Sequence, residues 1–155
     1  MKLALRVNGE AFEVEARADE SVLDVLRREL GLLSVRETCG IGVCGACTVL
    51  VDGAPMSGCL LLAPLAMGKE LTTVEGLGDD HPVQRAFAEA RGFQCGYCTP
   101  GMVLTAASLL AEQPRPSEKE VRLAMAGNLC RCGSYVKIID AVLGAADQKE
   151  DAWTS

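Results

Sequence analysis

The chain has 155 residues, of which 49% are hydrophobic and 23% are charged, and its formal net charge is −6 at pH 7. This is the composition of a globular protein, and an acidic balance without a basic stripe excludes a nucleic-acid binder. The longest apolar stretches, such as residues 59–67, are far too short to span a bilayer, so we expect no transmembrane segment.

The amino terminus and the cysteine content predict the cellular compartment. Residues 1–7 include an early charge but lack the long apolar core and the small-residue cleavage site of a secretory signal, so we expect a cytoplasmic chain. Thiols stay reduced in the cytoplasm. The eight cysteines are therefore expected to bind metal rather than to form disulfides.

The first half of the chain has the pattern of a small mixed sheet with one helix. The predicted strands cover residues 3–7, 12–16, 48–51 and 70–74. Asn8 and Gly9 separate the first two strands, and this dipeptide favours a tight hairpin turn. A helix is predicted over residues 21–30, with Ser21 as its cap and Gly31 as its stop. These elements predict a β-grasp sheet.

The second half has the periodicity of helices. It follows the stretch 76–82, which is predicted to be a linker or a surface turn. The expected helices cover residues 83–91, 100–112, 117–126 and 135–146. Pro100 at a first helical position, a capping box that begins at Ser117, and Ser134 as a cap mark three of their amino termini.

The fold class that these elements predict is α+β. We expect an amino-terminal β-grasp domain over residues 1–76 and a carboxy-terminal four-helix domain over residues 77–155. Residues 147–155 are expected to form a frayed tail. A chain of this length buries roughly 68–70% of its unfolded surface, which suffices for two small domains that bind cofactors.

The eight cysteines fall into two groups of four, and four thiolates are what an iron–sulfur cluster requires. The first group contains Cys39, Cys44, Cys47 and Cys59, and the second contains Cys95, Cys98, Cys130 and Cys132. The first group has the C-x4-C-x2-C spacing, with a distant fourth cysteine, of the plant-type [2Fe–2S] ferredoxins. Glycines between these cysteines let backbone N–H groups approach the negatively charged sulfurs. The β-grasp domain is therefore predicted to be ferredoxin-like.

The second group is predicted to bind its cluster at helix ends. Cys95 and Cys98 precede the helix that begins near Pro100, and Cys130 and Cys132 precede the last helix. Unpaired N–H groups and the helix dipole favour an anion there. Because Cys130 and Cys132 are two residues apart, they must lie outside a helix to face one site. Zinc is the alternative, since CxxC with further cysteines also describes zinc folds.

Three other side chains near the cysteines have predicted roles. Arg36 is expected to offset cluster charge, to meet partner carboxylates, or to lie on a solvated face. Phe93 and Tyr97 flank Cys95 and are expected to keep water from the cluster.

Three segments resemble the small iron–sulfur subunit of the molybdenum hydroxylases, the xanthine oxidase and carbon monoxide dehydrogenase family. They are residues 37–49 (ETCGIGVCGACTV), 94–102 (QCGYCTPGM) and 127–132 (GNLCRC), and the likeness extends from about residue 2 to about residue 146. One departure is visible, because residues 133–135 are Gly-Ser-Tyr where family members usually have Thr-Gly-Tyr.

The resemblance implies two domains that each bind one [2Fe–2S] cluster. In the family, electrons leave a molybdopterin centre in a large subunit, pass through the helical-domain cluster to the ferredoxin-like cluster, and reach FAD in a medium subunit. By position, Gln94 and Cys132 would approach the pterin. The expected function is that of an electron-transfer subunit in a heteromeric molybdenum-dependent oxidoreductase.

The sequence leaves two other functions open. One is a free-standing dicluster ferredoxin that moves between soluble partners, and the other is a zinc-stabilised interaction module. No nucleophile, general base or substrate pocket emerges from the sequence. We therefore assign no catalytic residue and expect no substrate turnover by this chain alone.

Overall fold

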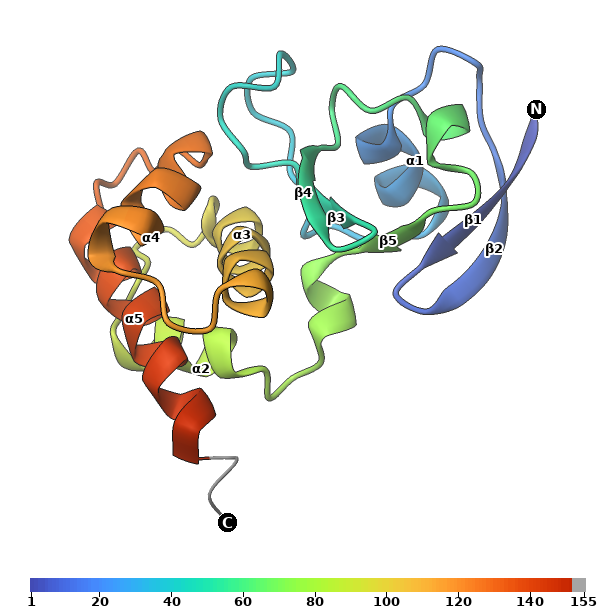
Figure 1. Ribbon diagram of the computed structural model, residues 1–155. Coiled ribbons are helices and arrows are strands. Elements are labelled where there is room, and N and C mark those ends of the chain that lie inside the picture. Colours follow the sequence, from blue (N-terminus) through green and yellow to red (C-terminus); the bar gives the residue numbers. More distant parts are fainter. Residues whose placement is uncertain (152–155) are drawn as a thin grey trace.

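The computed structural model describes residues 1–151, with side chains described for residues 1–146. The first half forms a sheet with one helix, and the second half forms a helical part beside it (Figure 1). The strands are β1 (Lys2–Val7), β2 (Glu10–Glu15), β3 (Thr48–Val51), β4 (Ala54–Ser57) and β5 (Glu70–Thr72). The helices are α1 (Val22–Glu29), α2 (Pro82–Glu89), α3 (Thr99–Glu112), α4 (Glu118–Ala124) and α5 (Tyr135–Asp151), with short 3-10 helices η1 (Ala63–Ala66), η2 (Val74–Leu77) and η3 (Met125–Gly127). The predicted α+β fold class is confirmed.

The strands form one mixed sheet in the order β2-β1-β5-β3-β4. β1 pairs antiparallel with β2 and parallel with β5, while β3 lies antiparallel to β4 and β5. Asn8 and Gly9, at φ 54° and 82°, form the predicted turn between β1 and β2. Left-handed backbone at both positions matches the twist of a two-residue hairpin, and Asn and Gly adopt it at least cost.

The sequence pattern did not predict β4. Three of its four residues are exposed, so the segment shows no apolar alternation. Pro55 also lacks the backbone N–H that a central strand uses for pairing. β4 lies at the edge of the sheet, which is where a strand tolerates proline. The signal that could have identified β4 is the dipeptide Asp52-Gly53, which forms a second two-residue turn at φ 50° and 86°.

β3 is buried on both faces and joins the sheet to the helical part. Val49 and Val51 lie in the core beneath α1, while the other two side chains of the strand, also buried, face the opposite side. α3 packs against β3 on that side, and its Ser108 hydroxyl donates to the carbonyl of Gly53 at 2.8 Å. The helical part is therefore docked directly on the sheet.

The predicted helices are present with shifted ends. α3 begins at Thr99, one residue before the predicted Pro100, and α4 stops at Ala124 before η3. The capping box is confirmed, because Ser117 accepts the N–H of Glu120 at 3.4 Å and the Glu120 carboxylate accepts the N–H of Ser117 at 2.7 Å. Within residues 1–151, none of the helices combines the length and apolar character that crossing a membrane requires.

The last helix departs from the prediction at both ends. α5 continues to Asp151, so the predicted frayed tail is wrong for residues 147–151, while residues 152–155 lie outside the described residues. Ser134 occupies the cap position, and its carbonyl accepts the N–H of Ile138 at 3.0 Å. Its hydroxyl, however, has no hydrogen-bond partner among the described residues, so the prediction that the Ser134 side chain caps α5 is wrong.

The first residue of the predicted linker, Gly76, is packed against neighbouring segments of the chain. The N–H of Gly76 donates to the carbonyl of Thr73 at 2.9 Å inside η2. Gly76 also lies so close to the Asn8 side chain that a Cβ would be 2.1 Å from Oδ1 of Asn8. The Ser34 hydroxyl donates to the Glu75 carboxylate at 2.5 Å. The predicted boundary at Gly76 thus falls within an ordered turn.

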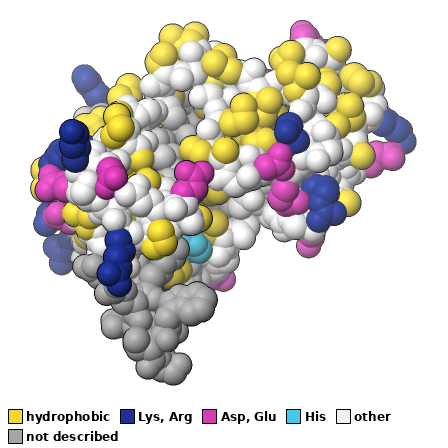
Figure 2. Space-filling model, in the orientation of Figure 1, with side chains coloured by type: hydrophobic (Ala, Val, Ile, Leu, Met, Phe, Trp, Pro, Cys, Tyr) yellow, Lys and Arg dark blue, Asp and Glu magenta, His cyan; other side chains and the backbone are white. Residues whose placement is uncertain are grey.

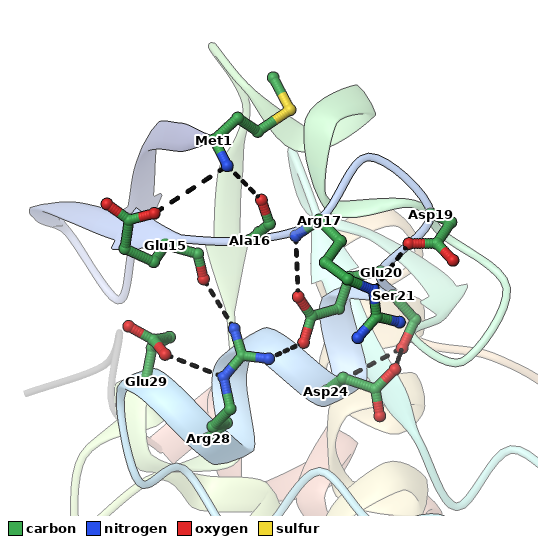
Figure 3. Close-up of polar contacts among 10 residues, drawn as sticks. All are labelled: Met1, Glu15, Ala16, Arg17, Asp19, Glu20, Ser21, Asp24, Arg28 and Glu29. Carbon is green, nitrogen blue, oxygen red and sulfur yellow. Dashed lines mark hydrogen bonds and ion pairs between the residues drawn. The ribbon is translucent and has the colours of Figure 1, made fainter.

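A buried carboxylate fixes the start of α1 (Figure 3). Glu20 is 4% exposed, accepts the N–H of Arg17 at 3.0 Å and forms an ion pair with Arg28. Ser21 accepts the N–H of Asp24 at 3.2 Å and is the predicted cap. The ion pair and the cap together set the direction in which the chain enters the helix.

Removal of Arg28 is expected to destabilise the fold. Arg28→Ala leaves the Glu20 carboxylate buried without its partner, which should lower the free energy of unfolding by about 2 kcal/mol. Arg122→Ala is the matched control, because the ion pair of Arg122 with Glu118 is exposed on both sides and is expected to contribute less than about 0.5 kcal/mol. Chemical denaturation measures both changes, and equal losses would contradict the role given to burial.

Candidate metal centres

The first cysteine group lies on either side of the β3-β4 hairpin. Cys39, Cys44 and Cys47 belong to the loop between α1 and β3, and Cys59 follows β4. The neighbouring thiol of Cys44 adds to the N–H groups of Ile41 and Val43 in lowering the pKa of Cys39, and that of Cys59 adds to burial in raising the pKa of Cys47. The hairpin therefore returns the distant Cys59 to the loop, as the spacing predicts, and the four thiols are neighbours.

Thiols of this group differ in their surroundings. The N–H groups of Ile41 and Val43 lower the pKa of Cys39 to about 6. Burial raises the pKa of Cys47 to about 11, although the N–H of Cys59 donates to its sulfur at 3.4 Å. A buried thiol with a raised pKa becomes a thiolate only when a cation balances its charge. Cys39 is thus prepared as an anion, and Cys47 depends on a metal to become one.

Two glycines let the loop approach its neighbours closely. Gly42, at φ 76°, lies so near Leu60 that a Cβ would be 2.3 Å from Cδ1 of that side chain. Gly45, at φ 72°, faces the helical part, where a Cβ would be 2.5 Å from the carbonyl oxygen of Gly127. Any side chain at position 45 would push the first cysteine loop away from the helical part.

The second cysteine group draws its members from two segments. Cys95 and Cys98 lie before α3, and Cys130 and Cys132 lie between η3 and α5. The neighbouring thiol of Cys132 adds to the N–H of Tyr97 in lowering the pKa of Cys95, and the thiol of Cys130 adds to burial in raising the pKa of Cys98. Cys130 and Cys132 lie outside helices, which confirms the prediction from their spacing. Each of these neighbouring pairs joins the two segments, so the four thiols converge.

Backbone N–H groups also surround this second group. The N–H of Tyr97 donates to the Cys95 sulfur at 3.5 Å and lowers the pKa of Cys95. Burial raises the pKa of Cys98 to about 12. Burial by itself would also raise the pKa of Cys130. The N–H groups of the following turn, above all that of Ser134, outweigh burial and lower this pKa. Both groups therefore combine a thiol that favours the anion with one that requires a metal.

A cavity of about 370 Å³ lies among the thiols of the second group. It is lined by Cys95, Cys98 and Cys130, and also by Cys44 of the first group. The two cysteine groups are therefore direct neighbours across the contact between the sheet and the helical part.

The donor set fits [2Fe–2S] clusters. Such a cluster takes two ligands on each of its two irons, and each group supplies four thiols from two segments of the chain. A structural zinc site also takes four ligands, gathered around one ion. The C-x4-C-x2-C spacing of the first group favours two-iron clusters over zinc.

One backbone hydrogen bond connects the two cysteine groups. The N–H of Leu129 donates to the carbonyl of Cys44 at 2.8 Å, and Leu129 directly precedes Cys130. Beside it lies Asn128, which is 4% exposed and whose amide donates to the carbonyl of Gly45 at 3.1 Å. Sequence reasoning gave Asn128 no role; its place two residues before Cys130 was the available signal.

Arg36 forms a second connection. Its Nη1 donates to the carbonyls of Gly96 at 2.6 Å and Tyr97 at 2.8 Å, and its guanidinium lies 5.0 Å from the centre of the Tyr97 ring. The Tyr97 hydroxyl donates to the carbonyl of Glu37 at 2.7 Å. These contacts clamp the 94–98 loop to the first cysteine loop, a role that was not among those predicted for Arg36.

Gln94 lies beside Cys132. Its Nε2 donates to the Cys132 carbonyl at 3.2 Å, which places together the two residues that the resemblance assigned to the pterin. Contact with a pterin stays a prediction. Cys95 is exposed, as are Phe93 and Tyr97, and the shielding of the cluster by these two rings stays a prediction.

Two family descriptions match consecutive parts of the chain. The family described as "2Fe-2S iron-sulfur cluster binding domain" matches residues 5–72. The family described as "[2Fe-2S] binding domain" matches residues 73–143.

Individual proteins are similar over nearly the whole chain. The nicotinate dehydrogenase small FeS subunit of Eubacterium barkeri is 46% identical over 147 residues, which cover 93% of this chain and 94% of the relative. A chain in the crystal structure of quinoline 2-oxidoreductase from Pseudomonas putida 86 has a TM-score of 0.92 and 42% identity, over 97% of this chain and 96% of that chain. The aldehyde oxidoreductase from Desulfovibrio desulfuricans has a TM-score of 0.93 and 38% identity over 97% of this chain, and the matched part is 17% of that longer chain.

Proposed function

Because the chain belongs to the family of small [2Fe–2S] subunits of the molybdenum hydroxylases, we propose that it conducts electrons between two partner subunits of one oxidoreductase. The observation that supports this most is the contact between the cysteine groups, where the N–H of Leu129 reaches the carbonyl of Cys44 at 2.8 Å. Relatives of the chain are themselves subunits of oxidoreductases, such as nicotinate dehydrogenase.

We assign the eight cysteines as the ligands of two clusters, one in each domain. The first set is Cys39, Cys44, Cys47 and Cys59, and the second is Cys95, Cys98, Cys130 and Cys132. A bound [2Fe–2S] cluster accepts one electron and releases it again. The corresponding domains are residues 1–76 and 77–155, and the position of each set within one half of the chain supports the assignment.

The backbone of the chain prepares both sites for negative charge. N–H groups reach the sulfur of Cys39 from Ile41 and Val43, and that of Cys95 from Tyr97. Thiolate ligands and an added electron both bring negative charge to these places, and N–H dipoles that already point at the sulfurs stabilise it. The loops therefore favour the anionic, metal-bound form without rearrangement.

Buried contacts hold the two sites at a fixed separation. Asn128 bonds to the carbonyl of Gly45, and its Oδ1 accepts the hydroxyl of Thr105 at 3.0 Å. Arg36, through partly exposed contacts, also clamps the 94–98 loop to the first cysteine loop. Since the rate of electron transfer falls steeply with distance, a fixed separation keeps the transfer between the two sites uniform.

We propose that the partners are a large subunit that binds molybdopterin and a medium subunit that binds FAD. Gln94 and Cys132 are assigned to the pterin side, where the amide of Gln94 orients the Cys132 carbonyl. The first cysteine loop is assigned to the FAD side. Its Ile41 and Val43 are 66% and 56% exposed, an apolar surface of the kind that partner proteins cover.

The surface around the first loop supports a protein partner. Figure 2 shows hydrophobic side chains gathered along the upper edge of the face drawn, where Figure 1 places this loop. Charged side chains are sparse along the middle of this upper edge and lie lower on the face and at its ends (Figure 2). Interface centres are depleted in charge in the same way.

We further propose a cytoplasmic location. The eight cysteines are all free thiols, and a reducing compartment keeps thiols available for metal. Accessible thiols such as Cys95 would otherwise be open to oxidation.

Co-purification tests the proposed function. A tagged full-length chain, expressed in its own host and recovered under mild conditions, is expected to bring two further chains, molybdenum and FAD. The host without the tagged gene is the control for non-specific capture. A chain that elutes alone with about four irons would contradict the subunit role and support the free-standing dicluster carrier.

A further inference from the structure

The second cysteine group contains unpaired buried hydroxyls. Among the side chains of residues 1–146, the buried side-chain nitrogen and oxygen atoms without a hydrogen-bond partner are Oγ1 of Thr99 and Oγ of Ser134. Thr99 directly follows Cys98, and Ser134 lies two residues after Cys132. A buried hydroxyl without a partner is unfavourable, and both of these lie next to residues assigned as cluster ligands.

Thr99 and Ser134 differ in what surrounds them. Thr99 helps to line a mostly apolar pocket of about 270 Å³, together with Phe87 and Phe93. Ser134 is 7% exposed, and its own N–H already reaches the sulfur of Cys130. A cluster held by Cys130 would bring further, negatively charged sulfurs to the neighbourhood of Ser134.

The usual role of a serine at this position does not apply to Ser134. A serine before a helix normally accepts an N–H from the first turn, but the Ser134 hydroxyl makes no such bond. The backbone of Ser134 is fully engaged, because its carbonyl accepts the N–H of Ile138 and its N–H bonds to Cys130. The residue is therefore held in place while its hydroxyl stays available.

We propose that the Ser134 hydroxyl donates a hydrogen bond to a sulfur of the second cluster and thereby raises the reduction potential of that cluster. The inference rests on the proposed function, since it requires a cluster held by Cys130. Reduction adds negative charge to the sulfurs, so an O–H donor stabilises the reduced state more than the oxidised state. Ser134 acts through the ligand sulfurs and is a positioning residue.

Redox titration of the full-length, iron-loaded chain, followed by electron paramagnetic resonance, tests this proposal. Ser134→Ala is expected to lower the reduction potential of the second cluster. The equilibrium constant for electron transfer between the clusters should shift about tenfold in favour of a reduced first cluster, which corresponds to about 59 mV for a one-electron couple. The potential of the first cluster should not change. Ser134→Thr, which keeps the hydroxyl, should restore most of the shift.

Ser108→Ala is the matched control. Ser108 is 5% exposed, close to the value for Ser134, but its hydroxyl donates to the carbonyl of Gly53. This variant should lose stability and leave both cluster potentials unchanged. Unchanged potentials in Ser134→Ala, with both clusters present, would overturn the proposal.

A second measurement does not depend on the potentials. Hyperfine spectra of the second-cluster signal in H₂O and D₂O should show one exchangeable proton that is absent from Ser134→Ala and present in Ser134→Thr. Identical spectra in all three proteins would overturn the hydrogen bond. Failure of the proposed function is distinguishable, because a chain that elutes alone with about four irons would contradict the subunit role and leave these spectra unchanged. A wild-type chain without iron would overturn both inferences.

Discussion

Gly101→Ala is expected to destabilise the chain by about 1–3 kcal/mol, even though alanine is the better helix former. Gly101 lies in the first turns of α3, where a Cβ would be 2.3 Å from the carbonyl oxygen of Gly45. That atom belongs to the backbone of the first cysteine loop and cannot move aside as a flexible side chain does. The added methyl group should push the loop away from α3.

Gly144→Ala in α5 is the matched control for this prediction. A Cβ at Gly144 would meet nothing within 4 Å, so only helix propensity acts, and stability should rise by about 0.5–1 kcal/mol. Denaturant unfolding of both variants gives the two changes. We expect them to have opposite signs, and stabilisation by both substitutions would contradict the close contact between the two cysteine groups.

Cys95→Ser is expected to remove one cluster and to leave the other intact. Iron should fall from about four to about two atoms per chain, and one of two paramagnetic signals should disappear on reduction. Cys39→Ser should remove the other signal, because Cys39 belongs to the group beside the sheet and Cys95 to the group in the helical part. Iron analysis and spin quantitation measure both effects.

The two cysteine variants are controls for each other. Each keeps seven of the eight cysteines and the same overall charge, so general damage to the fold would affect both signals in both variants. Loss of both signals in a folded single variant would contradict separate ligand sets. Loss of the same signal in both variants would contradict the assignment of Cys39 and Cys95 to different sites.

Features that depend on local geometry were predictable from the sequence. The Asn8-Gly9 turn, the capping box at Ser117 and the non-helical CxC segment follow from backbone preferences over a few residues. The return of Cys59 to the first loop was also predictable, because the strand after Cys47 and the Asp-Gly turn indicate a hairpin.

Features that depend on distant contacts were not predictable. Arg36 meets residues about 60 positions away, and Asn128 meets Gly45 from 83 positions away. No periodicity in a single sequence encodes such pairs, since each of these two polar residues could equally be predicted to lie on a solvent-exposed face. The unpaired hydroxyl of Ser134 was also missed, because its position before a helix indicated an ordinary cap.

Reductive titration of the anaerobically purified wild-type chain, with metal analysis, tests the two-cluster assignment most directly. We expect about four irons per chain and two distinct paramagnetic signals, each of which approaches one spin and reaches half its intensity at its own potential. A correctly folded chain that is colourless and free of iron, or that holds zinc in place of iron, would contradict the assignment of the eight thiols.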